Sequence, residues 1–264
     1  MDMVLHRANI TKLDTSNKNR YGNLAFKDCM LKVPGIIREN VQKSFPNMNW
    51  ALMNEVVIYF SDSWGNHQRI DYGTLHELSF FCLLFALFIG NYFEYDDFQA
   101  VVQILVYKYY RVSNQIIQRF NLEPAGNLGF LLPDQYQFLS FLFGSSELIG
   151  ESQITPTDSV PITRQNEEYD YFIRSTAEDY FYFETLLTAT KNKSGPFSEH
   201  SKFLWDVSRV EAWSKIYHGL LNMYRSEILQ RRPMIQHFLY GGLLSSKPRD
   251  VPQVGSEAKD QNAA

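Results

Sequence analysis

The strongest constraint on the fold is a polar stretch that runs directly into the most apolar part of the chain. Trp64–Glu77 holds two Gly, two His, an Arg, an Asp, a Thr and a Glu in one short span. Leu78–Phe93 follows at once and is mostly apolar. A loop rich in charged and hydrogen-bonding groups that leads into a buried helix can hold a functional site rigidly. We therefore expect the other helices to pack around this pair.

The apolar run is too short to cross a membrane. A bilayer-spanning helix needs about 20 apolar residues, and this run is interrupted by Ser79, Gly90 and Asn91. We expect a buried helix in a soluble protein that has no membrane partner.

Composition narrows the class of protein further. The chain has 264 residues, of which 45% are hydrophobic, so it can bury a sizeable core. A net charge of -4, with acids and bases mixed, disfavours nucleic-acid binding, which needs a basic surface. Two cysteines, Cys29 and Cys82, and no apolar leader at the N-terminus fit a reducing compartment. We expect a cytoplasmic protein, with the nucleus as a second location.

Apolar residues recur at helical spacing through most of the chain, and no segment shows convincing strand alternation. The predicted fold class is therefore all-α. We predict helices at Leu24–Leu31, Ile36–Val41, Trp50–Phe60 (capped by Asn49), from Asp96 or Asp97 to Phe120, from Pro133–Asp134 onward, Glu178–Lys191 and Glu211–Gln230. Residues 1–19 are expected to be a flexible N-terminus, residues 20–245 the folded domain, and residues 246–264 a disordered tail.

Common catalytic motifs are absent. No Cys and His set has zinc spacing, and neither a Gly-rich phosphate loop nor a Gly-x-Ser-x-Gly elbow occurs. Asp71-Tyr72-Gly73 is similar to the Asp-Phe-Gly of protein kinases, but the other kinase motifs are missing. Kinases and α/β-hydrolases are therefore disfavoured.

Two interpretations of the polar stretch remain open on the residues alone. Arg69 and Thr74 could hold a phosphate at a helix N-terminus. Alternatively, Arg69 pairs with Asp71 or Glu77 and only fixes the loop, which is the commoner arrangement. His76 and Glu77 could transfer a proton as a pair, but adjacent helical residues point apart, so we favour a structural His76.

Two further segments each carry a structural and a functional interpretation. Glu123–Gly129 could clamp a peptide or a cation, or could simply connect two helices. Gln236-His237-Phe238 could line a pocket or pack against the core.

Seven short motifs, taken together and in order, resemble the phosphotyrosyl phosphatase activator family, whose members activate serine/threonine protein phosphatase 2A. The motifs are Arg20–Phe26, Arg69–Glu77, Glu123–Gly126, Gln137–Leu139 with Gly144–Ser146, Gly195–Ser201, Trp213–Lys215 and Ile235–Phe238. The resemblance covers the chain from about Arg20 to Leu244.

The resemblance implies an all-α fold of core, linker and lid subdomains around a deep cleft. It implies binding of the phosphatase 2A catalytic subunit, with or without its scaffold subunit, and assistance by ATP and Mg²⁺. It also implies peptidyl-prolyl cis/trans isomerase activity on a proline-containing peptide.

Site residues follow from the same resemblance. The implied nucleotide contacts are Arg69, Thr74, Leu75 and the turn Gln236, His237 and Phe238. The implied magnesium position is Gly129 with Asp134. The candidate catalytic, peptide-facing residues are Asp71, Tyr72, Glu123, Pro124 and Gly126.

The chain departs from the family pattern at three places. Leu75 stands where the family usually has Gly, and Gln135 replaces the second residue of an acidic pair. The helical segment before the Arg20 motif is shorter than usual. These departures favour a rival hypothesis, a degenerate scaffold that binds the phosphatase without activating it. A stand-alone nucleotide hydrolase has little support because no general base is evident beside Arg69.

Overall fold

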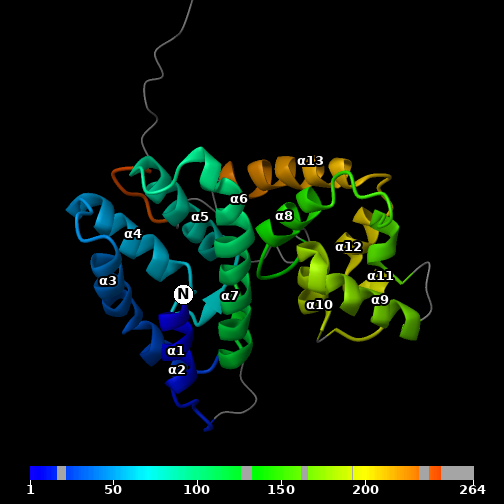
Figure 1. Ribbon diagram of the computed structural model, residues 1–264. Helices are drawn as coiled ribbons and strands as arrows, with labels where there is room; N and C mark the ends of the chain where they lie inside the picture. Colours follow the sequence, from blue (N-terminus) through cyan, green and yellow to red (C-terminus); the bar gives the residue numbers. More distant parts are fainter. Residues whose placement is uncertain (17–21, 126–132, 162–165, 192, 232–237, 245–264) are drawn as a thin grey trace, which may run out of the picture.

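The part of the protein described by its computed structural model is mainly helical, which confirms the all-α prediction (Figure 1). The described residues are 1–16, 22–125, 133–161, 166–191, 193–231 and 238–244. Two groups of helices lie side by side, α1–α7 in one and α8–α13 in the other (Figure 1). Each group has its own hydrophobic cluster.

The first group contains the polar stretch and the apolar run. Its elements are α1 (Asp2–Ile10), α2 (Ala25–Met30), α3 (Val33–Ser44), α4 (Trp50–Asp62), α5 (Thr74–Ile89), a 3-10 turn (Tyr95–Asp97), α6 (Phe98–Ala100), a π-helix (Val101–Val106) and α7 (Tyr107–Phe120). The apolar run forms α5, which packs against α4. The predicted cap of α4 is confirmed, since the Asn49 side chain accepts the Ala51 N–H at 2.8 Å.

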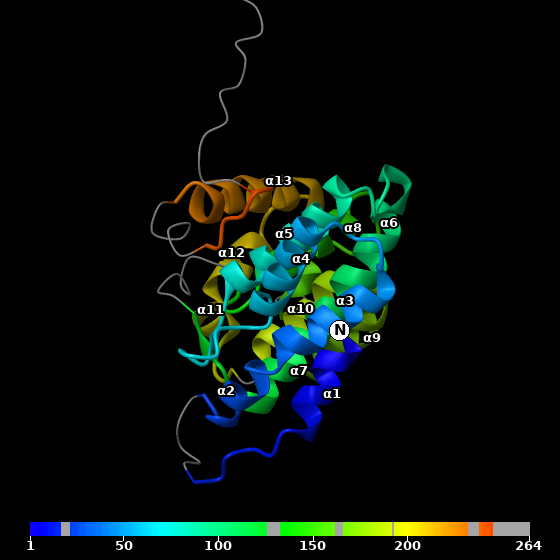
Figure 2. The same cartoon turned by 90° about the vertical axis from the view of Figure 1, so that its left-hand side faces the viewer.

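The second group packs around aromatic side chains of α8, α10 and α13. Its elements are α8 (Leu139–Glu147), a 3-10 turn (Pro156–Ser159), α9 (Asn166–Asp179), α10 (Phe181–Thr190), α11 (Phe197–His200), α12 (Lys202–Val207), α13 (Trp213–Tyr224) and a π-helix (Arg225–Leu229). Helix α13 lies along the top of the molecule, with α1 and α2 near the bottom (Figure 2). Gly144 lets α8 and α10 approach closely, because a Cβ there would lie 2.4 Å from the Tyr182 nitrogen.

Two short strands were not predicted. Strand β1 (Asp71–Tyr72) pairs in parallel with β2 (Glu123–Pro124), in the register Asp71 to Glu123 and Tyr72 to Pro124. Two-residue strands carry no alternation that a sequence pattern could reveal. Their pairing fixes the polar stretch to the segment that follows α7.

Other predicted boundaries were wrong for identifiable reasons. Residues 2–10 are not a flexible tail: they form α1, and Val4 and Ala8 are buried in the first cluster. The helix predicted over Glu178–Lys191 corresponds to α10, which begins at Phe181, whereas the preceding helix α9, which ends at Asp179, was not predicted.

The predicted helix start at Pro133–Asp134 was also wrong. Asp134 accepts N–H bonds from Tyr136 and Gln137 in a turn, and α8 begins only at Leu139. A remote carboxylate caps α8, because Glu77 accepts the N–H groups of Phe138 and Leu139, each at 2.9 Å.

Candidate functional site

The strand pair brings together two segments that the sequence analysis selected separately. Glu123 donates its N–H to the Ile70 carbonyl at 3.1 Å, and Ala125 donates to the Tyr72 carbonyl at 2.8 Å. Gly73 faces Ala125 so closely that a Cβ would lie 2.9 Å from the Ala125 oxygen. Asp71, Tyr72, Glu123 and Pro124 are therefore neighbours, whereas Gly126 lies outside the described residues.

A buried histidine organises the polar stretch. The Nδ1 of His76 donates to the Asp62 carbonyl at 2.6 Å and lies 3.6 Å from the Asp62 carboxylate. Its Nε2 lies 3.8 Å from Oδ1 of Asp71, an ion-pair distance rather than a hydrogen bond. Burial alone would lower the pKa of His76, but the two carboxylates outweigh it and raise the pKa to about 9. The structural interpretation of His76 is confirmed.

Arg69 forms the ion pair that the structural interpretation proposed. Its Nε donates to Oδ2 of Asp71 at 2.6 Å. Burial raises the pKa of Asp71, but contacts with His76 and Arg69 outweigh this and hold it below the usual value. Since 59% of the Arg69 side chain is exposed, its outer N–H groups face solvent beside a carboxylate that stays charged.

The side chain of Tyr72 packs in the core and does not reach the surface. Its side chain is fully buried, and its hydroxyl lies 2.7 Å from the hydroxyl of Tyr109, which donates to the Ser63 carbonyl at 2.7 Å. The Tyr72 carbonyl accepts the Ala125 N–H within the strand pair, so it is not free to accept a bond from a peptide. Glu123 is exposed, whereas Asp71 is buried and its carboxylate is covered by Arg69 and His76.

The implied nucleotide contacts are positioned by two elements. Thr74 is the first residue of α5 and is buried, and Leu75 beside it is half-buried. The Phe238 ring stacks on Tyr59 of α4 at a centroid distance of 5.9 Å. Glu55 holds the segment after Phe238 by accepting the N–H groups of Gly242 and Leu243. Gln236 and His237 lie outside the described residues.

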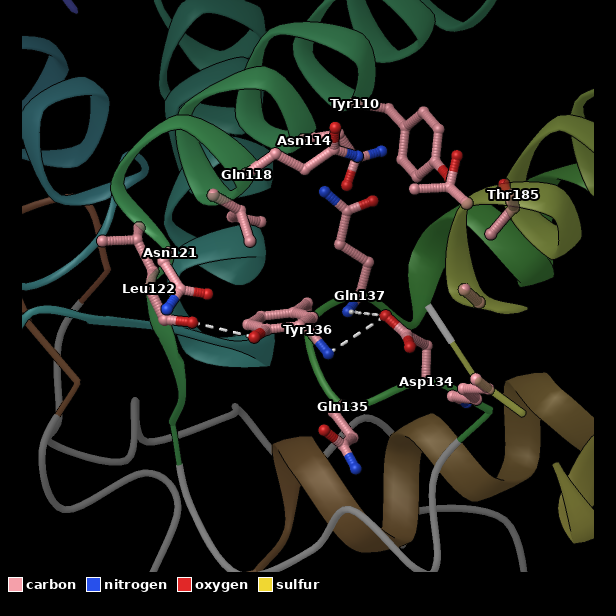
Figure 3. A pocket seen from close by; sticks show the side chains of 14 residues that line it. Tyr110, Asn114, Gln118, Asn121, Leu122, Asp134, Gln135, Tyr136, Gln137 and Thr185 are labelled. Carbon is pink, nitrogen blue, oxygen red and sulfur yellow. Dashed lines mark hydrogen bonds between the residues drawn. The ribbon is translucent and has the colours of Figure 1, made fainter. Parts of the chain in front are cut away.

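Asp134 lies in a polar cavity of about 300 Å³ between α7 and α10 (Figure 3). The α7 wall carries amides at helical spacing, Asn114, Gln118 and Asn121, and the α10 wall carries Thr185 and Thr188. The sequence analysis did not predict this cavity. The i, i+4, i+7 spacing of the amides could have indicated the cavity from the sequence. A helix normally turns such a polar face to solvent or to a polar partner.

The fit of this cavity to magnesium depends on a single carboxylate. Oδ2 of Asp134 accepts two backbone N–H groups, and burial raises the pKa of its carboxyl. Within the described ranges, no group of three or more His, Cys, Asp or Glu side chains could hold a metal ion. Mg²⁺ is often held by one or two carboxylates plus substrate phosphates, so Asp134 fits only the mode in which phosphate completes the shell. Gly129 lies outside the described residues.

Glu77 is a functional candidate that the sequence analysis assigned to the wrong partners. It points away from His76, as adjacent helical residues must, and pairs with neither it nor Arg69. Burial raises its pKa to about 7, although the bonds from Leu139 and Phe138 oppose the rise. Its capping of α8 spans 61 residues, so no local pattern could reveal it.

In the described part of the chain, the helices are all too short or too polar to reach across a bilayer.

The geometry defines an all-α protein in which a parallel strand pair joins a polar loop to the segment after α7, and in which Glu77 of α5 caps the first helix of the second group. The family model described as phosphotyrosyl phosphate activator (PTPA) protein matches residues 4–246. Because this match spans most of the chain, the protein belongs to the PTPA family, as its seven motifs indicated.

Individual relatives agree with the family match. The serine/threonine-protein phosphatase 2A activator of Drosophila melanogaster is 34% identical over 229 residues, which cover 87% of this chain and 56% of that protein. The serine/threonine-protein phosphatase 2A activator 2 of Saccharomyces cerevisiae is 32% identical, with 93% of this chain and 68% of the yeast protein covered.

A solved structure has the same fold. The crystal structure of the PP2A phosphatase activator Ypa1 PTPA1 matches with a TM-score of 0.81 and 30% sequence identity. The match covers 91% of this chain and 74% of that one.

Proposed function

We propose that this chain binds the catalytic subunit of protein phosphatase 2A and promotes its active form. Membership in the family and the names of the relatives support this function. The observation that carries it is the strand pair, which sets the buried carboxylate of Asp71, with its exposed partner Arg69, beside the exposed Glu123. Paired backbone and a fixed carboxylate form a rigid edge against which a partner segment can lie.

In this proposal ATP and Mg²⁺ assist the activation of the phosphatase, and the chain binds both. The outer N–H groups of Arg69 can grip a phosphate, because Asp71 engages only Nε. The N-terminus of α5 at Thr74 adds a positive helix dipole end. Asp134 would supply one carboxylate to magnesium. The nucleotide supplies the phosphate charge that this set of residues is suited to bind.

Prolyl isomerisation is the proposed second activity. Rotation about the amide has a barrier of about 18–20 kcal/mol, set by resonance in the planar bond. A surface can lower this barrier by binding the twisted amide and excluding water, without a nucleophile. Asp71 and the Glu123–Pro124 backbone are the groups of this chain that would contact such a peptide.

One specific observation favours a second candidate function, a scaffold that binds the phosphatase without activating it. Leu75 adds bulk directly after Thr74, and Gln135 cannot supply a second carboxylate near Asp134. Both changes weaken the nucleotide site and leave the Asp71 edge intact.

The deciding experiment is reactivation of an inactive phosphatase 2A catalytic subunit, with and without ATP and Mg²⁺. The proposal expects ATP-dependent reactivation by the natural chain and its loss in Asp71→Asn, assayed at a temperature at which circular dichroism shows that the variant is folded. Glu39→Gln, which alters an exposed ion pair of α3, is the matched control. Binding of the phosphatase with no reactivation under either condition would establish the scaffold.

A further inference from the structure

A second surface of this protein has the composition of a docking site. Beyond the C-terminal end of α5, the side chains of Phe88, Ile89, Phe93, Glu94, Tyr95 and Asp96 surround a hollow of about 480 Å³. We call this surface the acidic aromatic corner. It lies at the upper edge of the molecule in Figure 1, together with α6. Since α5 has 16 residues, about 24 Å of helix separates the corner from Thr74.

Aromatic side chains gather at this corner and remain exposed. The ring of Phe88 contacts those of Tyr95 and Phe98, each at a centroid distance of 5.2 Å. Tyr95 and Phe98 also meet edge to face at 5.4 Å. Nevertheless Tyr95 is 76% exposed and Phe98 is 43% exposed, and Ile89 beside them is 42% exposed. A contiguous exposed patch of this kind is typical of an interaction surface.

The charge of the corner is of one sign. Glu94, Asp96 and Asp97 are all exposed, and the chain has no Lys or Arg from residue 70 to residue 107. Glu94 and Asp97 cap each other's backbone across the 3-10 turn, which fixes both carboxylates. The negative charge therefore stands beside the rings in a defined geometry.

We propose that the acidic aromatic corner binds a basic segment of a partner protein, one that presents Lys or Arg beside an apolar side chain. A cationic head is attracted both by the carboxylates and by the faces of the aromatic rings. Its aliphatic stem, or an apolar neighbour, covers Ile89 and the ring edges. This site is separate from the Asp71 edge, so both surfaces can be occupied at once.

The test uses the full chain and a fluorescein-labelled helical peptide with Leu on one face and Lys and Arg on the other. Binding is measured by fluorescence anisotropy at low and high salt. We expect Tyr95→Ala to weaken binding at least fivefold and Asp96→Asn to weaken it about threefold while reducing its salt dependence. The same peptide with Glu in place of its basic residues is expected not to bind.

The control variant is Tyr171→Ala on α9. Tyr171 is also 76% exposed and stands among Glu167, Glu168 and Asp170, but among the described residues its ring contacts no other aromatic ring. We expect less than a twofold change for it. Equal losses at Tyr95 and Tyr171, or no loss at Tyr95, would overturn the proposal. So would sedimentation that shows self-association abolished by Tyr95→Ala, because the occupant would then be a second copy of this chain.

Discussion

At the scale of single residues, His76 is the group on which the polar stretch depends. Its two nitrogens face Asp62 and Asp71, and removal of the ring takes the cation away from Asp62 and leaves Asp71 with Arg69 alone. Breaking a buried pair from one side costs about 3–5 kcal/mol. We expect His76→Gln to lower the free energy of unfolding by roughly 3 kcal/mol, as measured by urea denaturation at pH 7.

The pH dependence of that stability follows from the raised pKa. The folded pKa is about 9 against an ordinary value of 6.5, so the stabilisation is complete below pH 6.5 and is lost as pH rises through 9. Urea titrations of the parent at pH 6, 7.5 and 9 should show a steady decline, which His76→Gln should remove. An identical decline in both proteins would contradict the assignment.

Glu77 contributes a pH dependence in a different range. Its folded pKa of about 7 lies above the ordinary value of 4.5, so the contribution of this carboxyl is present below pH 4.5 and is lost as pH rises through 7. The difference between these two pKa values corresponds to roughly 3 kcal/mol in the free energy of unfolding. We expect Glu77→Gln to flatten the change in unfolding free energy between pH 4.5 and 7. The exposed Glu211→Gln should leave that slope unchanged.

At the scale of elements, contacts local in sequence were predictable and remote ones were not. The start of α4 follows from Asn49, one residue before the helix, and α5 follows from its own apolar run. The pairing of Asp71 with Glu123 joins residues 52 positions apart, so neither strand has a local signal.

In the candidate site too, contacts between residues far apart in sequence could not be predicted. The sequence indicated that Asp71 and Glu123 belong together only through the family resemblance, and gave no sign that Tyr72 is buried. Tyr72 is hidden because its hydroxyl completes a chain of bonds through Tyr109 to the Ser63 carbonyl. Such a chain depends on two helices and a strand, and no pattern within one segment encodes it.

The contact between α8 and α10 supplies a prediction at the same scale. A methyl group on Gly144 would meet backbone atoms of Tyr182, which cannot rotate away, so the two helices must separate. We expect Gly144→Ala to destabilise the fold by about 1–3 kcal/mol. Gly219→Ala in α13 is the control, because its Cβ meets no atom within 4 Å. It should stabilise the helix by up to about 1 kcal/mol. Thermal unfolding followed by circular dichroism distinguishes the two outcomes.

At the scale of the whole molecule, the two helical groups are joined by ring contacts, among them those of Phe181 on α10 with Tyr107 and Tyr110 on α7, by a helix cap and by an ion pair. The rings of Phe81 on α5 and Phe143 on α8 stack at 5.4 Å, and Glu77 caps α8 beside them. On the outside, Arg111 of α7 makes a bidentate ion pair with Glu184 of α10. Buried ring contact removes apolar area from water, whereas an exposed ion pair contributes only about 0–1 kcal/mol. The ring contact and the cap should therefore decide whether the two groups unfold together.

Tryptophans in each group allow this coupling to be measured. Trp64 reports on the first hydrophobic cluster and Trp213 on the second. We consider two variants, each of which keeps either Trp64 or Trp213 as the only one of the four tryptophans of the chain. Their urea transitions are expected to coincide, because the groups unfold as one cooperative unit. Adding Phe81→Ala together with Glu77→Gln should separate the two transitions. Adding Arg111→Ala instead should leave them coincident. If the double change lowers both midpoints equally, the coupling resides in the helix contacts that remain, and the strand pair is the next element to break.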